Sequence, residues 1–131
     1  MFRFTILFLT GVALIGSCPA WSEENPVRTC TLSRGYECTP AGGCKEWPIK
    51  DFDLPRFVRI DLKEKTITSL DRKSPKNSGI QTVEEVPGMT VLLGVDKRGW
   101  TIALGKNSNS LSLAAAGDEE AFVLFGACLD P

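Results

Sequence analysis

The sequence contains no histidine, and this absence removes a large part of enzyme chemistry. Histidine is the side chain whose ordinary pKa lies closest to neutral pH, and it is a common metal ligand. Catalytic triads, histidine general bases and histidine-containing zinc sites are therefore excluded. Serine and threonine hydroxyls remain, but a nucleophilic hydroxyl needs a neighbouring base, and no Ser-x-x-Lys spacing supplies one.

An excess of charge is also missing, because 15 basic and 16 acidic residues leave a net charge of −1. A chain without a basic field does not gather nucleic acid or coat an anionic membrane, so neither is expected as a partner. The paired carboxylates of a glycosidase are not supplied by Glu84 and Glu85, since adjacent strand residues point to opposite faces. Asp51 and Asp53 are too few oxygen donors for calcium. The sequence predicts a protein that is not an enzyme and holds no metal or cofactor.

No apolar run is long enough to span a bilayer, which takes about 20 residues of helix. The longest run, Phe4 to Ile15, follows Arg3 and is typical of a signal peptide. We expect residues 1–22 to be this signal and residues 23–131 to be a single domain, exported to the periplasm or secreted. Small residues at Ala20 and Ser22 favour cleavage before Glu23.

A second way of processing stays open. Ile15-Gly-Ser-Cys18 is similar to a bacterial lipobox, in which the cysteine thiol would carry a lipid and anchor the protein to a membrane. The membrane is a partner only in that case. Both routes remove Cys18 from the thiols of the folded domain.

The four other cysteines, Cys30, Cys38, Cys44 and Cys128, are predicted to form two disulfides, as exported small domains usually do. No Cys-x-x-Cys spacing indicates a redox motif or a thiolate zinc site. Cys38 and Cys44 bracket a stretch of turn-forming residues and are expected to close a small loop. Cys30 then pairs with Cys128.

Hydrophobic residues alternate with polar ones from Val27 onward, which is the pattern of half-exposed strands. The expected strands after the first are 57–62, 66–70, 80–86, 89–95, 100–104, 110–113 and 121–129. The sequence predicts an all-β domain, either a small antiparallel up-and-down barrel or a two-sheet sandwich, of about seven to eight strands stapled by disulfides. Segment 121–129 is apolar on both faces and should be central. Gly99 is expected to be left-handed in a hairpin turn.

The segment from Cys44 to Pro55 shows no alternation and is predicted to be a loop. Trp47, Asp51, Phe52 and Asp53 within it would present an aromatic and acidic surface to a partner. In the alternative interpretation, Trp47 and Phe52 plug one end of the barrel.

The C-terminal half, with its Arg98-Gly99-Trp100 hairpin and its ending Phe122-Val-Leu-Phe-Gly-Ala-Cys128, resembles a group of small exported bacterial proteins of unassigned function. The resemblance covers residues 57 to 128 and implies export and a β fold. At the level of a two-disulfide β-barrel, the domain is also similar to the periplasmic lysozyme inhibitors. Their inhibitory loop is not matched residue by residue, so no functional residue is carried over.

These observations together predict a non-enzymatic binding domain of the bacterial envelope, with a protein or a glycan as its partner. The alternative is an envelope structural or accessory lipoprotein tethered through Cys18.

Overall fold

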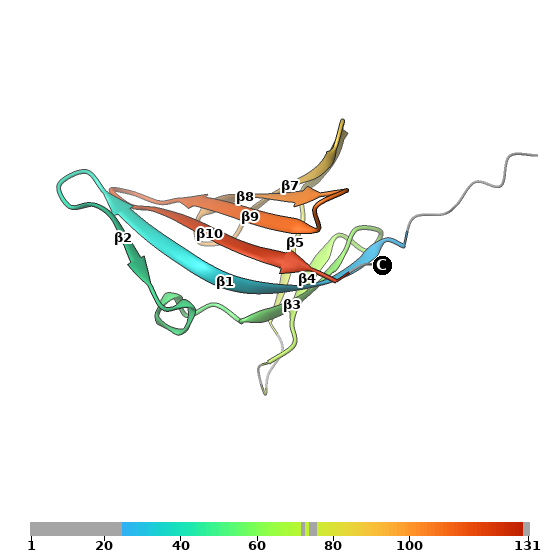
Figure 1. Cartoon of the computed structure of the whole chain (residues 1–131), viewed down its shortest axis with the longest axis horizontal. Helices are drawn as coiled ribbons and strands as arrows, with labels where there is room; N and C mark the ends of the chain where they lie inside the picture. Colours follow the sequence, from blue (N-terminus) through green and yellow to red (C-terminus); the bar gives the residue numbers. More distant parts are fainter. Residues whose placement is uncertain (1–24, 72, 74–75, 130–131) are drawn as a thin grey trace, which may run out of the picture.

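The computed structural model describes residues 25–71, 73 and 76–129. The predicted signal peptide 1–22, with its lipidation candidate Cys18, lies outside these residues. The described chain forms ten β-strands of one antiparallel sheet and a short 3-10 helix, η1 (Figure 1). The elements are, in chain order, β1 (Val27–Thr39), β2 (Gly43–Trp47), η1 (Ile49–Phe52), β3 (Phe57–Asp61), β4 (Thr66–Ser69), β5 (Asn77–Gly79), β6 (Thr82–Val86), β7 (Met89–Val95), β8 (Gly99–Gly105), β9 (Ser110–Ala116) and β10 (Ala121–Cys128).

The sheet has the strand order β5-β4-β3-β1-β10-β9-β8-β7-β6, and β2 pairs with β1 beside this path. Its two edge strands, β5 and β6, follow each other in the chain and are separated only by Ile80 and Gln81. The Ile80 N–H donates to the Lys65 carbonyl, and the Gln81 N–H donates to the Leu93 carbonyl. This link holds the two ends of the sheet near each other, so the sheet curls into a half-barrel.

The core fills the inside of the curl. Side chains at alternate strand positions point inward and include the fully buried Ile60, Leu92 and Leu124. The buried cluster consists of Cys30, Leu32, Val58, Ile60, Ile80, Leu92, Ile102, Leu104, Leu111 and Leu124. Because members come from β3 on one side of the strand order, from β7 on the other, and from the link residue Ile80, burial of this cluster stabilises the curl of the sheet.

The predicted all-β class and the antiparallel order are confirmed, and β10 is central as expected, between β1 and β9. The two-sheet sandwich is not formed, because the described strands belong to one sheet. Two segments predicted as connections contain strands. Residues 43–47 pair with β1 as β2, and residues 77–79 pair with β4 as β5. Segment 80–86 becomes a strand only from Thr82, because Ile80 and Gln81 form the link between the edges.

The hairpin between β7 and β8 forms where predicted, but the expectation for Gly99 was wrong. Gly99 pairs with Val95 as the first residue of β8 and is not among the glycines with positive φ, which are Gly43 and Gly88. The three residues 96–98 close the turn by themselves, with the Asp96 N–H donating to the Arg98 carbonyl over 3.1 Å. No left-handed residue is then needed at position 99.

Both disulfides join directly opposed residues of neighbouring strands and match the predicted pairing. Cys30–Cys128 connects the first strand to the last, and Cys38–Cys44 closes the hairpin between β1 and β2. Cys30 is part of the buried core, whereas Cys44 is exposed on β2. The first bridge therefore ties the two chain ends at the middle of the sheet, and the second ties only a local hairpin.

Simultaneous Cys30→Ala and Cys128→Ala should lower the free energy of unfolding by about 4 to 5 kcal/mol, and Cys38→Ala with Cys44→Ala by about 2 kcal/mol. The loops that the bridges close differ in size, with sequence separations of 98 and 6. Urea denaturation of both double variants measures the difference. Equal losses of unfolding free energy in the two double variants would contradict the idea that the Cys30–Cys128 bridge stabilises the fold by closing a long loop.

Candidate functional site

One concave surface of the described chain arises from an interruption along one edge of β1. Both β2 and β3 pair with this edge, β2 at Gly35 to Thr39 and β3 at Val27 to Thr31. Residues 32–34 lie between the two, at the point where the register of β1 against β10 shifts. The chain leaves the edge after Trp47, forms η1, and returns at Phe57. A groove is left where no strand covers β1.

The groove has a volume of about 430 Å³ and is lined by Leu32, Ser33, Pro48, Ile49, Lys50, Leu54, Arg56 and Asp71. This size lies in the range of ligand sites, about 300 to 1,000 Å³. The Arg56 carbonyl accepts a hydrogen bond from the Leu32 N–H over 2.8 Å, which holds the returning chain against the interruption in β1. The groove is therefore supported by backbone contacts and not only by side chains.

The groove combines an apolar wall with a cationic rim. Leu32 is buried, Ile49 is half-buried, and Leu54 keeps 38% of its surface exposed. Lys50 and Arg56 are exposed beside them. The carboxylate of Asp71 accepts from the Arg56 N–H over 2.8 Å, so it serves partly to hold the loop. The lining contains two cations and one anion. It is therefore suited to a ligand that combines an apolar group with an acidic group close to it.

The residues predicted to bind a partner are close together in the chain but do not form one surface. Trp47 is the last residue of β2, next to the groove residue Pro48, and is 43% exposed. Phe52 turns the other way: its ring covers Gly35 and meets the ring of Phe122 edge-on, with centroids 5.9 Å apart. Phe52 thus packs inward as the alternative interpretation described, and Trp47 stays at the surface.

Asp51 and Asp53 do not line the groove. Asp51 is exposed on η1, and its N–H donates to the Pro48 carbonyl. Asp53 ends the helix in a left-handed conformation, with φ of 52°, that aspartate adopts more readily than most residues. Their positions give both residues a part in the local turn of the backbone.

Sequence reasoning missed the residues that form the groove, above all Leu54 and Arg56. The only available signal was that Leu54-Pro55 stands in a segment without alternation, which indicated that this stretch does not form a core strand. Leu32 and Ser33 had no such signal, because the register shift beside them depends on how β1 meets β10.

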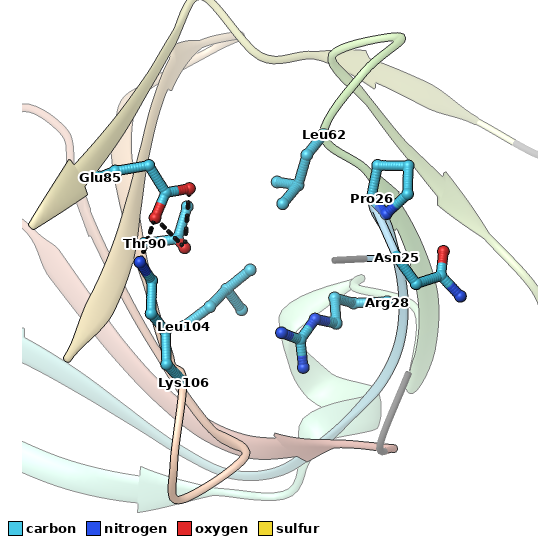
Figure 2. Close-up of a pocket in the computed structure, with 8 residues that line it drawn as sticks. All are labelled: Asn25, Pro26, Arg28, Leu62, Glu85, Thr90, Leu104 and Lys106. Atoms are coloured by element: carbon cyan, nitrogen blue, oxygen red, sulfur yellow. Dashed lines mark hydrogen bonds and ion pairs between the residues drawn. The ribbon is translucent and has the colours of Figure 1, made fainter. Parts of the chain in front are cut away.

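A second, smaller cavity of about 160 Å³ lies inside the curl, where β1 begins and the β6–β7 and β8–β9 turns meet. Figure 2 shows Arg28 reaching toward it from β1, while Glu85, Thr90 and Lys106 lie on the opposite side. The Glu85 carboxylate lies 2.7 Å from the Lys106 ammonium, and the Thr90 hydroxyl donates one hydrogen bond shared between the two carboxylate oxygens, at 3.0 and 3.1 Å. The remaining lining residues are Asn25, Pro26, Leu62 and Leu104.

The contacts of Glu85 lower its pKa. The hydrogen bond from Lys106 has the largest effect, the Thr90 hydroxyl and the positive charge of Arg28 add to it, and partial burial opposes it. A carboxylate with a lowered pKa stays ionised at neutral pH and is a poor general acid. Its neighbour Glu84 pairs with Val91 and points outward, so the two carboxylates are on opposite faces as predicted.

Comparisons with known proteins found no matching family model, no matching curated protein and no matching solved structure. Within residues 25–71, 73 and 76–129, no helix is long and apolar enough to cross a membrane. The same part of the chain contains no cluster of cysteine, aspartate and glutamate side chains arranged to hold a metal ion. The function must therefore be argued from the surface itself.

Stability should depend on pH through Glu85. Because its pKa is lower in the folded chain, its ion pair stabilises the fold fully above the pKa of unfolded glutamate, about 4.3, and this contribution is lost as the pH falls through the folded pKa. Since Glu85 is half-exposed, Glu85→Gln should cost only about 0.5 to 1 kcal/mol at neutral pH, and the difference from the unchanged protein should shrink below about pH 4.

Thermal unfolding at several pH values measures this difference. The matched control is Glu84→Gln, which removes a carboxylate from the outer face of the same strand. A pH-independent effect of Glu85→Gln would mean that the side chain acts through packing and not through its charge.

Proposed function

We propose that this chain is an exported, non-enzymatic binding domain whose partner is a protein of the bacterial envelope. The groove between β2 and β3 receives an extended segment of that partner, with an apolar side chain against Leu54 and Ile49 and acidic side chains near Lys50 and Arg56. The bound segment lies along residues 32–34 of β1, where neither β2 nor β3 covers the strand edge.

Export is supported by the signal-like residues 1–22 and is compatible with the two disulfides, which persist in oxidising compartments. A binding role without catalysis is supported by the absence of histidine and by the separation of the only adjacent carboxylates on β6. Neither observation depends on the groove.

The observation that carries the proposed site is the exposure of Leu54 in a concave, cation-rimmed surface. An exposed leucine alone means little, since folded proteins expose much apolar surface. Here it lies in a groove large enough for a side chain, with two cations that a partner can pair with and a half-exposed Trp47 at the adjoining strand end. Aromatic and arginine side chains beside an apolar pocket are typical of energetically important interface residues.

The proposal can be tested with two synthetic peptides in which leucine alternates either with aspartate or with lysine. The aspartate peptide should bind and the lysine peptide should not, because Lys50 and Arg56 attract the first and repel the second. Leu54→Asp should weaken binding of the aspartate peptide by more than about tenfold, since it places a like charge at the apolar wall. Fluorescence anisotropy of labelled peptides measures both effects.

Leu129→Asp provides the matched control, because Leu129 is also exposed but lies at the end of β10, away from the groove lining. This variant should bind as the unchanged protein does. Equal binding of the two peptides, or equal loss in the two variants, would refute the groove as the binding site. Binding of cell-wall glycan fragments that depends on Trp47 would favour the glycan partner instead.

We expect the exported polypeptide to begin at Glu23, as the small residues Ala20 and Ser22 favour. Intact mass measurement on protein recovered from bacterial cells decides between the two processing routes. A diacyl or triacyl adduct on Cys18 would establish the tethered lipoprotein. A Cys18→Ser variant that is processed and released like the unchanged protein would exclude it.

A further inference from the structure

The outer face of strands β7 to β10 carries no charged side chain. The strand registers place Met89, Val91, Leu93 and Val95 of β7 in rows with alternate residues of β8, β9 and β10. These are Gly99, Thr101, Ala103, Gly105, Ser110, Ser112, Ala114, Ala116, Ala121, Val123, Phe125 and Ala127. Met89, Leu93, Val95 and Phe125 are all exposed. Four adjacent strands thus turn apolar and small polar residues to solvent, where sheets normally place charged ones.

The sizes of these side chains counter the curvature of the sheet. The outer face of a curled sheet is convex, and β8 and β9, the two middle strands of this four-strand part, form its crest. The crest carries only glycine, alanine, serine and threonine, whereas β7 carries methionine, valine and leucine, and β10 carries valine and phenylalanine between two alanines. Small residues on the crest and large ones beside it make the side-chain surface flatter than the backbone. A flat, uncharged surface is suited to packing against another sheet.

Opposite charges stand at the two ends of one row across this face. In the row that runs through Val91, Ala103, Ser112 and Phe125, the next residue on β6 is Glu84 and the next on β1 is Arg34. Glu84 has no ion-pair partner within the described part of the chain. Arg34 is paired with Glu46 through Nε and Nη2, at 3.0 and 3.2 Å, and Nη2 also donates to the Tyr36 hydroxyl. These contacts leave the N–H groups of Nη1 for a second carboxylate.

We propose that two copies of this chain pack through the outer faces of β7 to β10, forming a two-fold dimer. A two-fold axis that runs along the strands, between β8 and β9, brings the crests together and places β6 of one copy over β1 of the other. Glu84 of each copy then meets Arg34 of its partner, so both rims carry an ion pair. A second copy is the occupant because its surface has the required absence of charge and the matching charges at the rims.

The size of the face predicts a weak dimer. Four strands about 4.8 Å apart and about 24 Å long present roughly 450 Å² per copy. The total of about 900 Å² is less than the roughly 1,200 to 2,000 Å² of stable interfaces. The rim contacts of β6 and β1 enlarge this area. Association should therefore depend on concentration in the micromolar range.

Sedimentation velocity of the disulfide-bonded protein tests the proposal. The unchanged protein should shift from monomer to dimer as its concentration rises. Ala114→Glu should raise the dimer dissociation constant more than about tenfold, because it puts an unpaired carboxylate at the centre of the interface. Ala41→Glu is the matched control, since Ala41 is an exposed alanine at the tip of the β1–β2 hairpin, and it should leave the equilibrium unchanged.

Charge reversal at the rims tests how the two copies are oriented, and it does not involve residues of β8 or β9. Glu84→Arg and Arg34→Glu should each weaken self-association about tenfold, because each variant brings like charges together at both rims. An equimolar mixture of the two variants should form a heterodimer as strong as the original dimer, since both rim pairs are then complementary. Circular dichroism checks that each variant is folded. Formation of the heterodimer in the mixture would also show that both variants keep a folded interface.

A protein that stays monomeric at every concentration refutes the proposal, and so does a dimer that Ala114→Glu leaves intact. A dimer sensitive to Ala114→Glu but without recovery in the charge-reversal mixture refutes the orientation. Lipid is the competing occupant: monomeric protein that binds phosphatidylcholine vesicles, and loses this binding in Ala114→Glu, would assign the face to a membrane.

Discussion

The short link between β5 and β6 is the constraint on which the rest of the structure depends. These strands are the two edges of the sheet, and only Ile80 and Gln81 separate them in the chain. The three Cα–Cα steps from Gly79 to Thr82 span at most about 11 Å, so the ends of the sheet cannot lie apart as in an open, flat sheet. Burial of Ile80 at this junction, with backbone hydrogen bonds to Lys65 and Leu93, makes the curl energetically favourable. Curling creates an inner face for the core and a convex outer face.

The groove follows from a second constraint, the sharing of one edge of β1 by two partners. A strand of 13 residues is long enough to pair with both β2 and β3. The connection between these two strands must leave the edge of β1 and return to it, so part of that edge stays without a strand partner. The interruption falls where the register against β10 shifts, next to Leu32. Cys30–Cys128 lies at one side of this shift and holds β1 against β10, so the irregularity stays local. One wall of the groove thus lies close to the Cys30–Cys128 disulfide, and the connection between β2 and β3 forms the rest of the lining together with Asp71.

Sequence reasoning could predict what depends on local pattern. Alternation located β3, β4 and β6 to β10, the apolar β10 was correctly predicted to be central, and cysteine spacing with turn residues gave the disulfide pairing. It could not predict β2, whose residues are all exposed and so show no inside-outside pattern. The three residues of β5 are too few for a period to be read. The groove was missed because it results from the meeting of β1 with three other strands, a long-range relation that Leu54 and Arg56 do not encode locally.

The distribution of charge between the two faces of the sheet argues that its outer surface is covered in the working protein. Ionised side chains occur at the inner cavity, where the Glu85 carboxylate pairs with Lys106 and accepts a hydrogen bond from Thr90. The outer face of β7 to β10 has free access to water, which would solvate charges at little cost, and carries none. At roughly 450 Å², this face is similar in size to the largest apolar patches of typical monomers, about 300 to 600 Å², and such patches often have a function. A surface that costs solubility and serves no packing within the chain is best explained by packing against another molecule.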